Sequence, residues 1–396
     1  MTIRGTPSIG KRNRCPSCPN ALQIASGQAS GAERQASLSY RRTDARRANS
    51  MLAATFAVGS CKPSLPSYGS ISAAVSSVPS GSTVEVCPGT YAEQVFITQS
   101  LTLKGIASGN TSDVIITVPV SGLTVISDVF GDQIAAPVAV TAGSVNISNL
   151  TVDGTGNGVT SPTWLTGIYY GDGSSGIVSE VTVRNLSAFG RGIGAWIVGL
   201  GGESITVENS SFHDIDNASV LPAGSFSPTV KGNTMEASFI QVQWLGGPGS
   251  LTGNVMNGGQ IGVYTDSPGT VSGNTITNAT SYGIWMPFGP GSFNVTSNKI
   301  SNVPTGIYLT EGGDTYKANS ITKVGIAIEC NCFVPTVVSN TINDAGTGLD
   351  NVPASFSGAN AFNNVGTIRT GGCAAARSKG APDVPGRHLP IPVHVN

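Results

Sequence analysis

Four acidic residues in the second half of the chain have the side-chain type and spacing that acid–base chemistry on a glycosidic bond requires. They are Asp266, Glu311, Asp314 and Glu329. Glycoside hydrolysis uses two carboxyl groups roughly 5–10 Å apart. Carboxylates at turns are as often only solvated, and such a group could also bind calcium, although no calcium-loop motif surrounds these residues. We treat Asp266, Glu311 and Glu329 as candidate catalytic residues, with no cofactor identified and calcium left open.

His213 is a further candidate for proton transfer, because it stands beside acids in His213-Asp214-Ile215-Asp216. A histidine in this setting could be a general base, a metal ligand or a surface side chain. Cys15 and Cys18 have the spacing of half a zinc site, but no second half with matching spacing follows. The sequence therefore predicts no metal site.

Aromatic and amide side chains could bind sugar rings if they point away from the interior. In the segment Gly283-Ile284-Trp285-Met286, strand alternation buries Ile284 and Met286 and points Trp285 outward. The same rule predicts outward positions for Tyr169, Gln241 and Tyr308. Sugar rings can lie flat on indole or phenol rings. The alternative is that these side chains pack beneath loops or a neighbouring chain.

These side chains must be positioned by a repeat that contains an asparagine between apolar residues, as in Val230-Lys-Gly-Asn233-Thr-Met235. The asparagines recur at spacings of 21, 20, 24, 21, 21 and 20 residues. Self-similarity of this period is typical of a solenoid in which each repeat forms one coil. The repeated asparagines are Asn233, Asn254, Asn274, Asn298, Asn319 and Asn340, and Asn360 begins a last copy.

Stacking of the coils explains why asparagine recurs. Coils lie about 4.8 Å apart, so equivalent residues form columns. A side-chain amide can donate and accept along such a column, and asparagine tolerates the left-handed turn conformation. We therefore predict a structural asparagine ladder, with at least two short strands in each coil and no helix in the repeat.

The earlier coils are less regular. Asn149, Asn185 and Asn209 stand one position out of the later register, and longer excursions occur at 153–163 and 222–228. Loops of this kind are where solenoids usually place their binding sites.

Before the first coil, Ile71, Ala74, Val75 and Val78 have helical spacing, and strands follow at 84–86, 95–97 and 101–103. A short helix here would cap the open end of the solenoid and cover its strand edges.

The entry segment and the repeat together resemble the right-handed parallel β-helix, or pectin-lyase-like, superfamily. The resemblance rests on 68–75, on Gly89-Thr-Tyr-Ala-Glu93 and on the Asn-x-Ile coils, and it covers about residues 54–373. It implies an all-β, single-stranded right-handed parallel β-helix with a short N-terminal capping helix, and it is compatible with several activities on polysaccharides. The motif at 89–93 is similar to the opening motif of pectin methylesterases, whose later motifs are not found.

Seven cysteines suggest an oxidising compartment. Cys61 and Cys87 flank one short unit and are predicted to form a disulfide, while the pairing of Cys330, Cys332 and Cys373 stays open. We therefore expect an extracellular or periplasmic protein.

Composition and charge limit the partners. Only 11% of residues are charged and there are 52 glycines, which excludes disorder and helical bundles. Residues 51–373 hold nine Lys and Arg against nineteen Asp and Glu, a net charge of −10. This charge argues against nucleic acid, and against an acidic sugar without a bridging cation. No apolar run approaches the ~18 residues of a membrane span, and we expect a monomer.

The two ends of the chain lack hydrophobic periodicity. Residues 1–50 are Arg-rich and are predicted to be either a disordered extension or a wrongly assigned N-terminal extension. Residues 374–396 are predicted to be a disordered tail. The apolar stretch at 51–58 is compatible with a short signal peptide, but we favour a first strand at 54–58. The β-helix is therefore assigned to residues 51–373.

Two functions remain open for this solenoid. It could be an exported protein that binds, and could also cleave, a polysaccharide or cell-surface glycan along an outer face. It could instead be a non-catalytic structural or adhesive surface solenoid.

Overall fold

The computed structural model describes residues 53–106, 113–287, 293–309, 315–330 and 335–371. The chain divides between Met51 and Leu52 into two compact units, and all described residues belong to the second. The predictions for residues 1–50 and 374–396 lie outside the described residues. So do those for Glu311, Asp314, Cys332 and Cys373.

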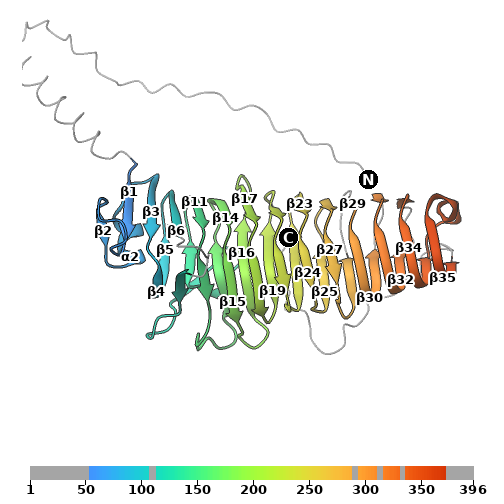
Figure 1. The fold of residues 1–396 in the computed structure, drawn as a ribbon, viewed down its shortest axis with the longest axis horizontal. Helices are drawn as coiled ribbons and strands as arrows, with labels where there is room; N and C mark the ends of the chain where they lie inside the picture. The colour runs from blue at the N-terminus through green and yellow to red at the C-terminus, as the bar shows by residue number, and fades with distance from the viewer. Residues whose placement is uncertain (1–52, 107–112, 288–292, 310–314, 331–334, 372–396) are drawn as a thin grey trace, which may run out of the picture. The chain divides into compact units, whose positions relative to one another are not determined.

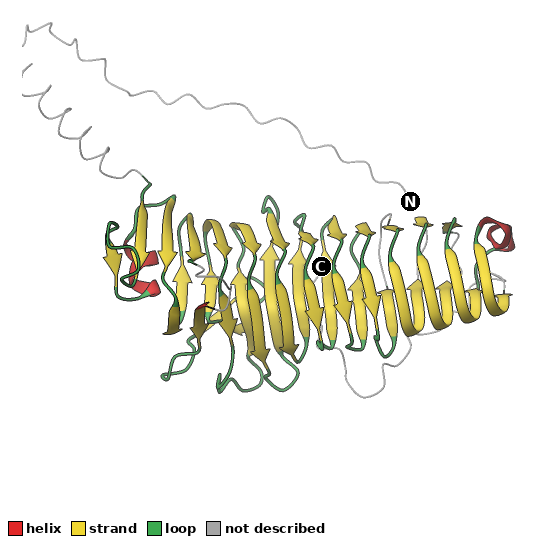
Figure 2. Ribbon diagram, viewed as in Figure 1, coloured by secondary structure: helices red, strands yellow, loops and turns green. Residues whose placement is uncertain are grey.

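The second unit is a β-solenoid of about 12 coils, as the repeat predicts (Figure 1). The only helices among its described residues are α2 (Ile71–Ser77) near the first coils and the 3-10 helix η2 (Ala354–Ala359) near the last, drawn in red in Figure 2. Two sheets of parallel strands run along the coils, and β8 and β9 pair in the antiparallel sense.

The first sheet contains 13 strands and forms one wall of the coils up to the one that contains β33. In spatial order they are β2 (Ser67–Tyr68), β1 (Thr55–Val58), β3 (Ser82–Val86), β6 (Leu101–Gly105), β11 (Gly143–Ser148), β14 (Ser174–Ser179), β17 (Ile205–Glu208), β20 (Thr229–Lys231), β23 (Gly249–Thr252), β26 (Gly269–Ser272), β29 (Phe293–Thr296), β31 (Thr315–Lys317) and β33 (Thr336–Val338).

The second sheet contains 22 strands, because most coils contribute a short strand and a longer one to it. The strands up to the irregular coils are β4 (Gly89–Ala92), β5 (Val95–Ile97), β7 (Val114–Thr117), β8 (Val125–Ser127), β9 (Gln133–Ala135), β10 (Val138–Val140), β12 (Thr151–Asp153), β13 (Trp164–Tyr170), β15 (Thr182–Leu186) and β16 (Gly192–Gly199). The later ones are β18 (Ser211–Ile215), β19 (Ala218–Gly224), β21 (Thr234–Glu236), β22 (Ile240–Gly246), β24 (Val255–Asn257), β25 (Ile261–Thr265), β27 (Thr275–Thr277), β28 (Tyr282–Met286), β30 (Lys299–Leu309), β32 (Ser320–Cys330), β34 (Thr341–Asp350) and β35 (Ala361–Thr370).

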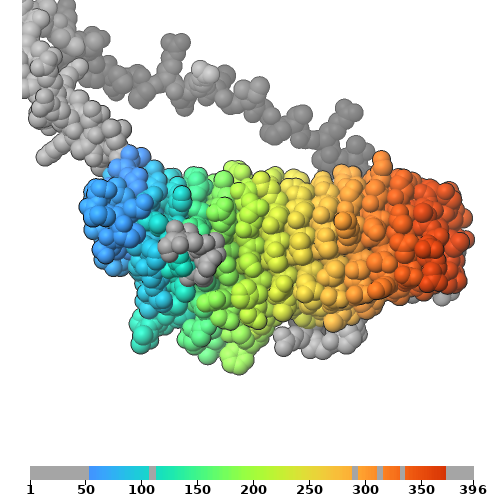
Figure 3. Space-filling view, in the orientation of Figure 1, coloured from blue at the N-terminus to red at the C-terminus, as the bar shows by residue number. Residues whose placement is uncertain are grey.

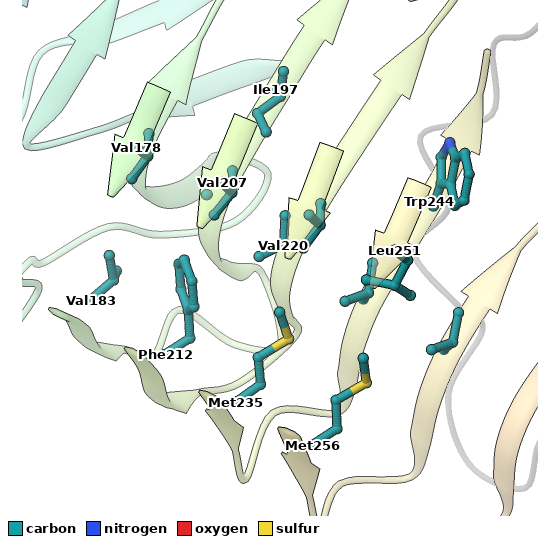
Figure 4. Close-up of a cluster of buried hydrophobic side chains, with 14 of the residues drawn as sticks. Val178, Val183, Ile197, Val207, Phe212, Val220, Met235, Trp244, Leu251 and Met256 are labelled. Atoms are coloured by element: carbon teal, nitrogen blue, oxygen red, sulfur yellow. The ribbon is translucent and has the colours of Figure 1, made fainter. Parts of the chain in front are cut away.

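The interior of the coils is a continuous hydrophobic core. Strand alternation points apolar side chains into it from the first sheet and from both the short and the longer strands of the second sheet. Because the coils stack, similar residues lie above one another along the axis. Figure 4 shows this packing in the middle coils, where the labelled side chains are Val178, Val183, Ile197, Val207, Phe212, Val220, Met235, Trp244, Leu251 and Met256.

A column of asparagine side chains lines one corner of the coils. Each Oδ1 from Asn254 to Asn360 accepts two hydrogen bonds, from the backbone N–H and the Nδ2 of the preceding asparagine, at 2.8–3.0 Å. The second Nδ2 proton is donated to a carbonyl of the neighbouring coil, as from Asn274 to Leu251. The buried polar groups of the column therefore satisfy one another.

The conformation of this corner explains the register of the earlier asparagines. Asn149 and Asn209 have φ values of 56° and 49° and occupy the left-handed position just before the column, which Gly232 fills in a later coil. Ser210 then takes the column position, and its N–H donates to Oδ1 of Asn233 at 3.0 Å. Asn185 (φ 59°) was wrongly grouped with them, because it lies at the other corner with Asp214 (φ 56°).

The N-terminal end of the solenoid is closed by α2 and a disulfide. Ser70 caps α2 by accepting from the N–H of Ala73, and Glu93 accepts from the N–H groups of Ile71 and Ser72. The disulfide joins Cys61, after β1, to Cys87, after β3, with a Cα–Cα distance of 5.7 Å. The first strand is β1 at Thr55–Val58, and it lies within the segment 54–58 for which a strand was predicted. No helix in the described part of the chain is long and apolar enough to span a membrane.

Candidate functional site

One column of side chains runs along the outer face of the longer strands of the second sheet. Pairing between strands sets its members side by side, for example Tyr169 beside Trp196 and Trp285 beside Tyr308. We call it the outer column; its residues are Phe96, Ala139, Tyr169, Trp196, Leu221, Gln243, Tyr264, Trp285, Tyr308, Glu329, Asp350 and Thr370.

Four rings form a contiguous aromatic group on this face: Tyr264, Tyr282, Trp285 and Tyr308. Trp285 meets Tyr264 edge to face at 5.1 Å between ring centroids and stacks on Tyr282 at 5.3 Å. Tyr282 also lies 5.5 Å from the ring of Tyr308. The group spans three successive coils because β25, β28 and β30 are neighbours in the sheet.

The prediction that these side chains are exposed is wrong. Tyr169, Trp285 and Tyr308 are 3%, 3% and 5% exposed, and they belong to a second hydrophobic cluster outside the coil interior. Their rings pack on neighbours in adjacent coils, about 4.8 Å away along the axis. Half-buried residues such as Tyr282 and Phe239 pack against the same cluster.

Gln241 does not lie in the outer column, contrary to the sequence prediction. Its Oε1 accepts from the Ser219 hydroxyl, and its Nε2 donates to the carbonyls of Asn257 and Gly258, so the side chain is fully buried at a corner of the coil. Alternation fails here because the strand bends between Ile240, which packs in the outer cluster, and Val242, which packs in the interior.

Three members of the outer column carry N–H donors without an acceptor. Nε1 of Trp196, Nε2 of Gln243 and Nε1 of Trp285 are buried and have no hydrogen-bond partner among the described residues. Thr166, one coil from Ile193 on the same face, has an unpartnered hydroxyl as well. Nearly all buried polar groups in proteins are paired, so four such groups on one face distinguish it from the coil interior.

The candidate catalytic carboxylates are separated along the axis. Tyr264 pairs with Trp285, Trp285 with Tyr308, and Tyr308 with Glu329, so Glu329 lies three coils beyond the strand that ends next to Asp266. Three coil spacings amount to about 14 Å, which exceeds the separation of a hydrolase pair. Asp266 and Glu329 are therefore not brought together.

The register instead places Asp350 directly beside Glu329, one coil away. Thr370 donates to Oδ1 of Asp350 at 2.5 Å. The sequence contains the signal for this pair, and for Gln243, because Gln243, Glu329 and Asp350 each lie ten residues after an asparagine of the repeat.

Burial and charge shift the pKa values on this face. Burial, followed by the nearby Glu329 carboxylate, raises the pKa of Tyr308 to about 12. Burial also raises the pKa of Asp266, whose Oδ1 accepts from the N–H of Gly246 and the hydroxyl of Ser267. The phenols on this face therefore remain protonated donors at neutral pH.

His213 lies on a different wall from the outer column. It is in the short strand β18, between Arg184 and Glu236 of the adjacent coils, and its Nδ1 is 2.7 Å from Oδ2 of Asp214. Its side chain is 33% exposed. The structure therefore does not bring it together with Asp266 or Glu329.

Metal binding has little support in the described part of the chain. No three side chains of His, Cys, Asp or Glu there are grouped so that they could hold an ion. Cys330 is buried at the end of β32.

Asp153 is held by donors from two coils, and this predicts an acid-sensitive contribution to stability. Burial opposes ionisation, but hydrogen bonds from Thr155, Asn185 and Arg184 outweigh it and lower the pKa to about 2. A carboxyl with a lowered folded pKa stabilises the fold above its unfolded pKa of about 3.9, and this contribution is lost as pH falls towards 2. Because Arg184 is 32% exposed and screened, we expect Asp153→Asn to cost about 1–2 kcal/mol at pH 7.

Urea unfolding from pH 7 to pH 2 measures this difference. The gap between Asp153→Asn and the unmodified protein should close as pH falls below about 4. Asp214→Asn is the control, because its carboxylate is 63% exposed and should contribute little. A gap that stays constant down to pH 2 would contradict the ionic origin.

Comparison with known proteins identifies the fold. Residues 136–321 match the family model described as a right handed beta helix region. No protein of curated function matches the sequence.

Solved structures share the architecture at low identity. The GH136 lacto-N-biosidase from Eubacterium ramulus is 10% identical, with a TM-score of 0.54 over 83% of this chain and 70% of that one. The Dettilon tailspike protein is 14% identical, with a TM-score of 0.47 over 76% and 63%. The mannuronan C-5 epimerase A-module from Azotobacter vinelandii is 15% identical, with a TM-score of 0.41 over 76% and 94%.

At these identities the likeness concerns the fold and not the activity. The family match, the parallel coils and the asparagine column agree with one another. Residues 136–321 therefore form a right-handed β-helix region, and the stacked coils before and after it continue the same fold.

Proposed function

We propose that this protein is exported and binds a polysaccharide along the outer column, with the aromatic group as the contact for a sugar ring. The observation that carries the proposal is the set of unpartnered donors of Trp196, Gln243 and Trp285 in one column. Sugar hydroxyl and ring oxygens are acceptors that such donors can bind.

The solvent-facing member of the aromatic group is the place where a ligand would make its first contact. Tyr282 is half-buried, whereas Tyr264, Trp285 and Tyr308 are buried. Its ring lies on Trp285 at an interplanar angle of 28°. A rotation of the Tyr282 side chain would uncover the indole face and its N–H, and a pyranose ring could stack in its place.

The charges of the outer column favour a neutral glycan. The column contains Glu329 and Asp350 at its C-terminal end and no Lys or Arg at its twelve positions. An acidic sugar would meet like charge there without a basic partner.

The disulfide and the fold are compatible with export. A Cys61–Cys87 bond persists in an oxidising compartment and is rare in the cytosol. One protein with the same fold is a lacto-N-biosidase, an enzyme named for its action on a glycan.

Cleavage of the bound glycan is a second candidate function, and the Glu329–Asp350 pair favours it. Side chains paired on adjacent strands are separated by about 5 Å, the distance used by hydrolases that retain stereochemistry. This pair, rather than Asp266 with Glu329, is where we would place such chemistry.

Two tryptophan-to-phenylalanine changes test the binding proposal. In Trp285→Phe, which removes the unpartnered N–H and leaves a smaller aromatic ring, retention on neutral galactomannan or xylan should weaken about tenfold, the loss of one hydrogen bond of about 1.4 kcal/mol. Its melting temperature should fall only by the cost of packing the smaller ring, since Trp285 is buried between Tyr264 and Tyr282. In the control Trp244→Phe the lost N–H donates to the carbonyl of Gly247 inside the coil, so stability should fall and retention should not.

Affinity electrophoresis and thermal melts of the full chain give both readouts, with polygalacturonate as the acidic comparison. A Trp285→Phe variant that melts as low as Trp244→Phe and binds as before would contradict the proposal, because its N–H would then have an internal partner. Release of reducing ends that vanishes in Asp350→Asn and Glu329→Gln would establish cleavage, and retention without product would establish binding alone.

A further inference from the structure

The turn that precedes β16 has an unfavourable residue at a left-handed position. Phe189 and Gly190 have φ values of 54° and 79°, and the N–H of Arg191 donates to the carbonyl of Ala188 at 3.0 Å. Two central residues with positive φ are the mark of a type I′ turn, in which Asn-Gly is strongly preferred. A bulky aromatic residue at positive φ is a rare and strained choice.

This conformation is held from outside the turn by the carboxylate of Asp216 and by Asn217, whose Nδ2 donates to the carbonyl of Gly190 at 2.7 Å. Oδ2 of Asp216 accepts from the N–H groups of Ala188 and Gly190 at 2.9 and 2.8 Å, and Oδ1 accepts from that of Gly192 at 2.6 Å. The turn therefore cannot relax into a conformation that suits phenylalanine without losing these bonds.

Packing does not explain the phenylalanine either. Phe189 is 80% exposed, while the adjacent Ala188 is 3% exposed. An exposed ring in a strained conformation gains neither burial energy nor backbone stability in the free protein, so its advantage must come from a contact with another molecule.

The surroundings of Phe189 suit a sugar more than a protein. Nδ2 of Asn157 donates to the carbonyl of Ser187, and the guanidinium of Arg191 lies 4.7 Å from the ring centroid of Trp164. The turn thus adjoins the loop at 154–163, one of the loops that project below the strands of the irregular coils in Figures 1 and 3.

That loop and the segment 118–125 line an open pocket of about 570 Å³ whose lining residues include amide and hydroxyl groups but no charged side chain among those described. A neutral, hydroxyl-rich molecule matches this lining. One isolated ring is also too small for a protein interface, which buries about 800 Å² per partner.

We infer that the turn at 188–191 is a sugar-stacking platform, on which Phe189 binds the apolar face of a hexose ring at the edge of the outer face. The inference rests on the proposed glycan binding and extends it to a second contact, because the platform leads directly into β16, the strand that carries Trp196. The ligand class is a neutral polysaccharide long enough to reach both contacts.

Opposite effects on stability and on binding test this inference. Phe189→Asn creates the preferred Asn-Gly turn, so the melting temperature should rise by about 2 °C. Removal of the ring should weaken retention on immobilised galactomannan or xylan about fivefold, the effect of losing one ring-stacking contact. The conservative variant Phe189→Tyr keeps the ring and should retain the unmodified affinity.

The outcomes separate this inference from the proposed function. If Phe189→Asn melts higher but binds as well as the unmodified protein, while Trp285→Phe binds weakly, the platform is overturned and glycan binding stands. If the unmodified protein is retained on neither neutral glycan, both are overturned. Weaker binding of Phe189→Asn with rescue by Phe189→Tyr supports the platform.

Discussion

Replacement of Asn274 by leucine is expected to lower the free energy of unfolding by about 4 kcal/mol, because it leaves several buried polar groups without partners. The backbone N–H and the Nδ2 of Asn254 lose their shared acceptor, and the carbonyl of Leu251 loses its donor. All of these groups lie where water does not enter, since Asn254 and Asn274 are fully buried. Urea unfolding monitored by circular dichroism measures the loss.

Two further variants keep this prediction testable. Asn294→Leu introduces the same side chain at an exposed position of the neighbouring coil and should change stability by no more than about 0.5 kcal/mol. Asn274→Ser should lose roughly half as much unfolding free energy as the leucine variant. A serine can replace part of the hydrogen bonding, since Ser210 occupies the same column and its N–H and hydroxyl are both hydrogen-bonded. A leucine variant as stable as the Asn294 control would rule out the hydrogen bonds of the column as a major source of stability.

Replacement of Cys61 and Cys87 by serine is expected to cost about 3.5 kcal/mol, since the disulfide closes a loop with a sequence separation of 26 residues. The loop contains β2, α2 and β3, which are the elements that close the N-terminal end of the solenoid. Without the bond, the unfolded chain gains conformational freedom, and β1 is held by its strand pairing and by the packing of Val58 in the core. Thermal melts of the oxidised protein and the double variant give the difference.

Reduction provides the matched control for the disulfide. In dithiothreitol the unmodified protein and the double serine variant should melt at the same temperature, because the Cys61–Cys87 bond is then absent from both. Equal melting temperatures for the oxidised protein and the variant would show that strand pairing and α2 hold the end without the bond.

The two largest effects both concern groups that hold the coils together, and neither concerns the outer column. The asparagine column satisfies its own hydrogen bonds, whereas Trp196, Gln243 and Trp285 in the outer column leave theirs open. A change in the first set should therefore break internal hydrogen bonds and lower stability. Loss of an open donor in the second set should alter binding, and its effect on stability should be limited to the repacking of the side chain. Variants of the two sets can be compared on this basis.

The period of the asparagines was sufficient to predict the fold. Coil stacking repeats every position of the chain, so Asn233 to Asn340 had to form a column once the repeat was read as a solenoid. The capping helix could be predicted because Ile71, Ala74 and Val75 form one apolar face of a short helix. Both features depend on residues close in sequence or on strict repetition.

The direction in which Trp285, Tyr169 and Tyr308 point could also be predicted from neighbouring residues, because alternation along a strand sets the face on which a side chain lies. Their burial could not be predicted in this way, since it depends on rings from adjacent coils, such as Tyr264 and Tyr282 around Trp285. A single strand carries no information about what packs over it. The exposed column predicted from sequence is therefore a buried cluster.

Sequence alone thus determined that this chain is a parallel β-helix with a capped first coil and asparagines at one corner. Tertiary structure decided the register at bends and corners. It placed Gln243 rather than Gln241 in the outer column, separated Asp266 from Glu329, and set Asp350 beside Glu329. The physical reason is that a one-residue bend in a strand shifts every later side chain to the other face, and only the pairing of neighbouring coils reveals where that bend occurs.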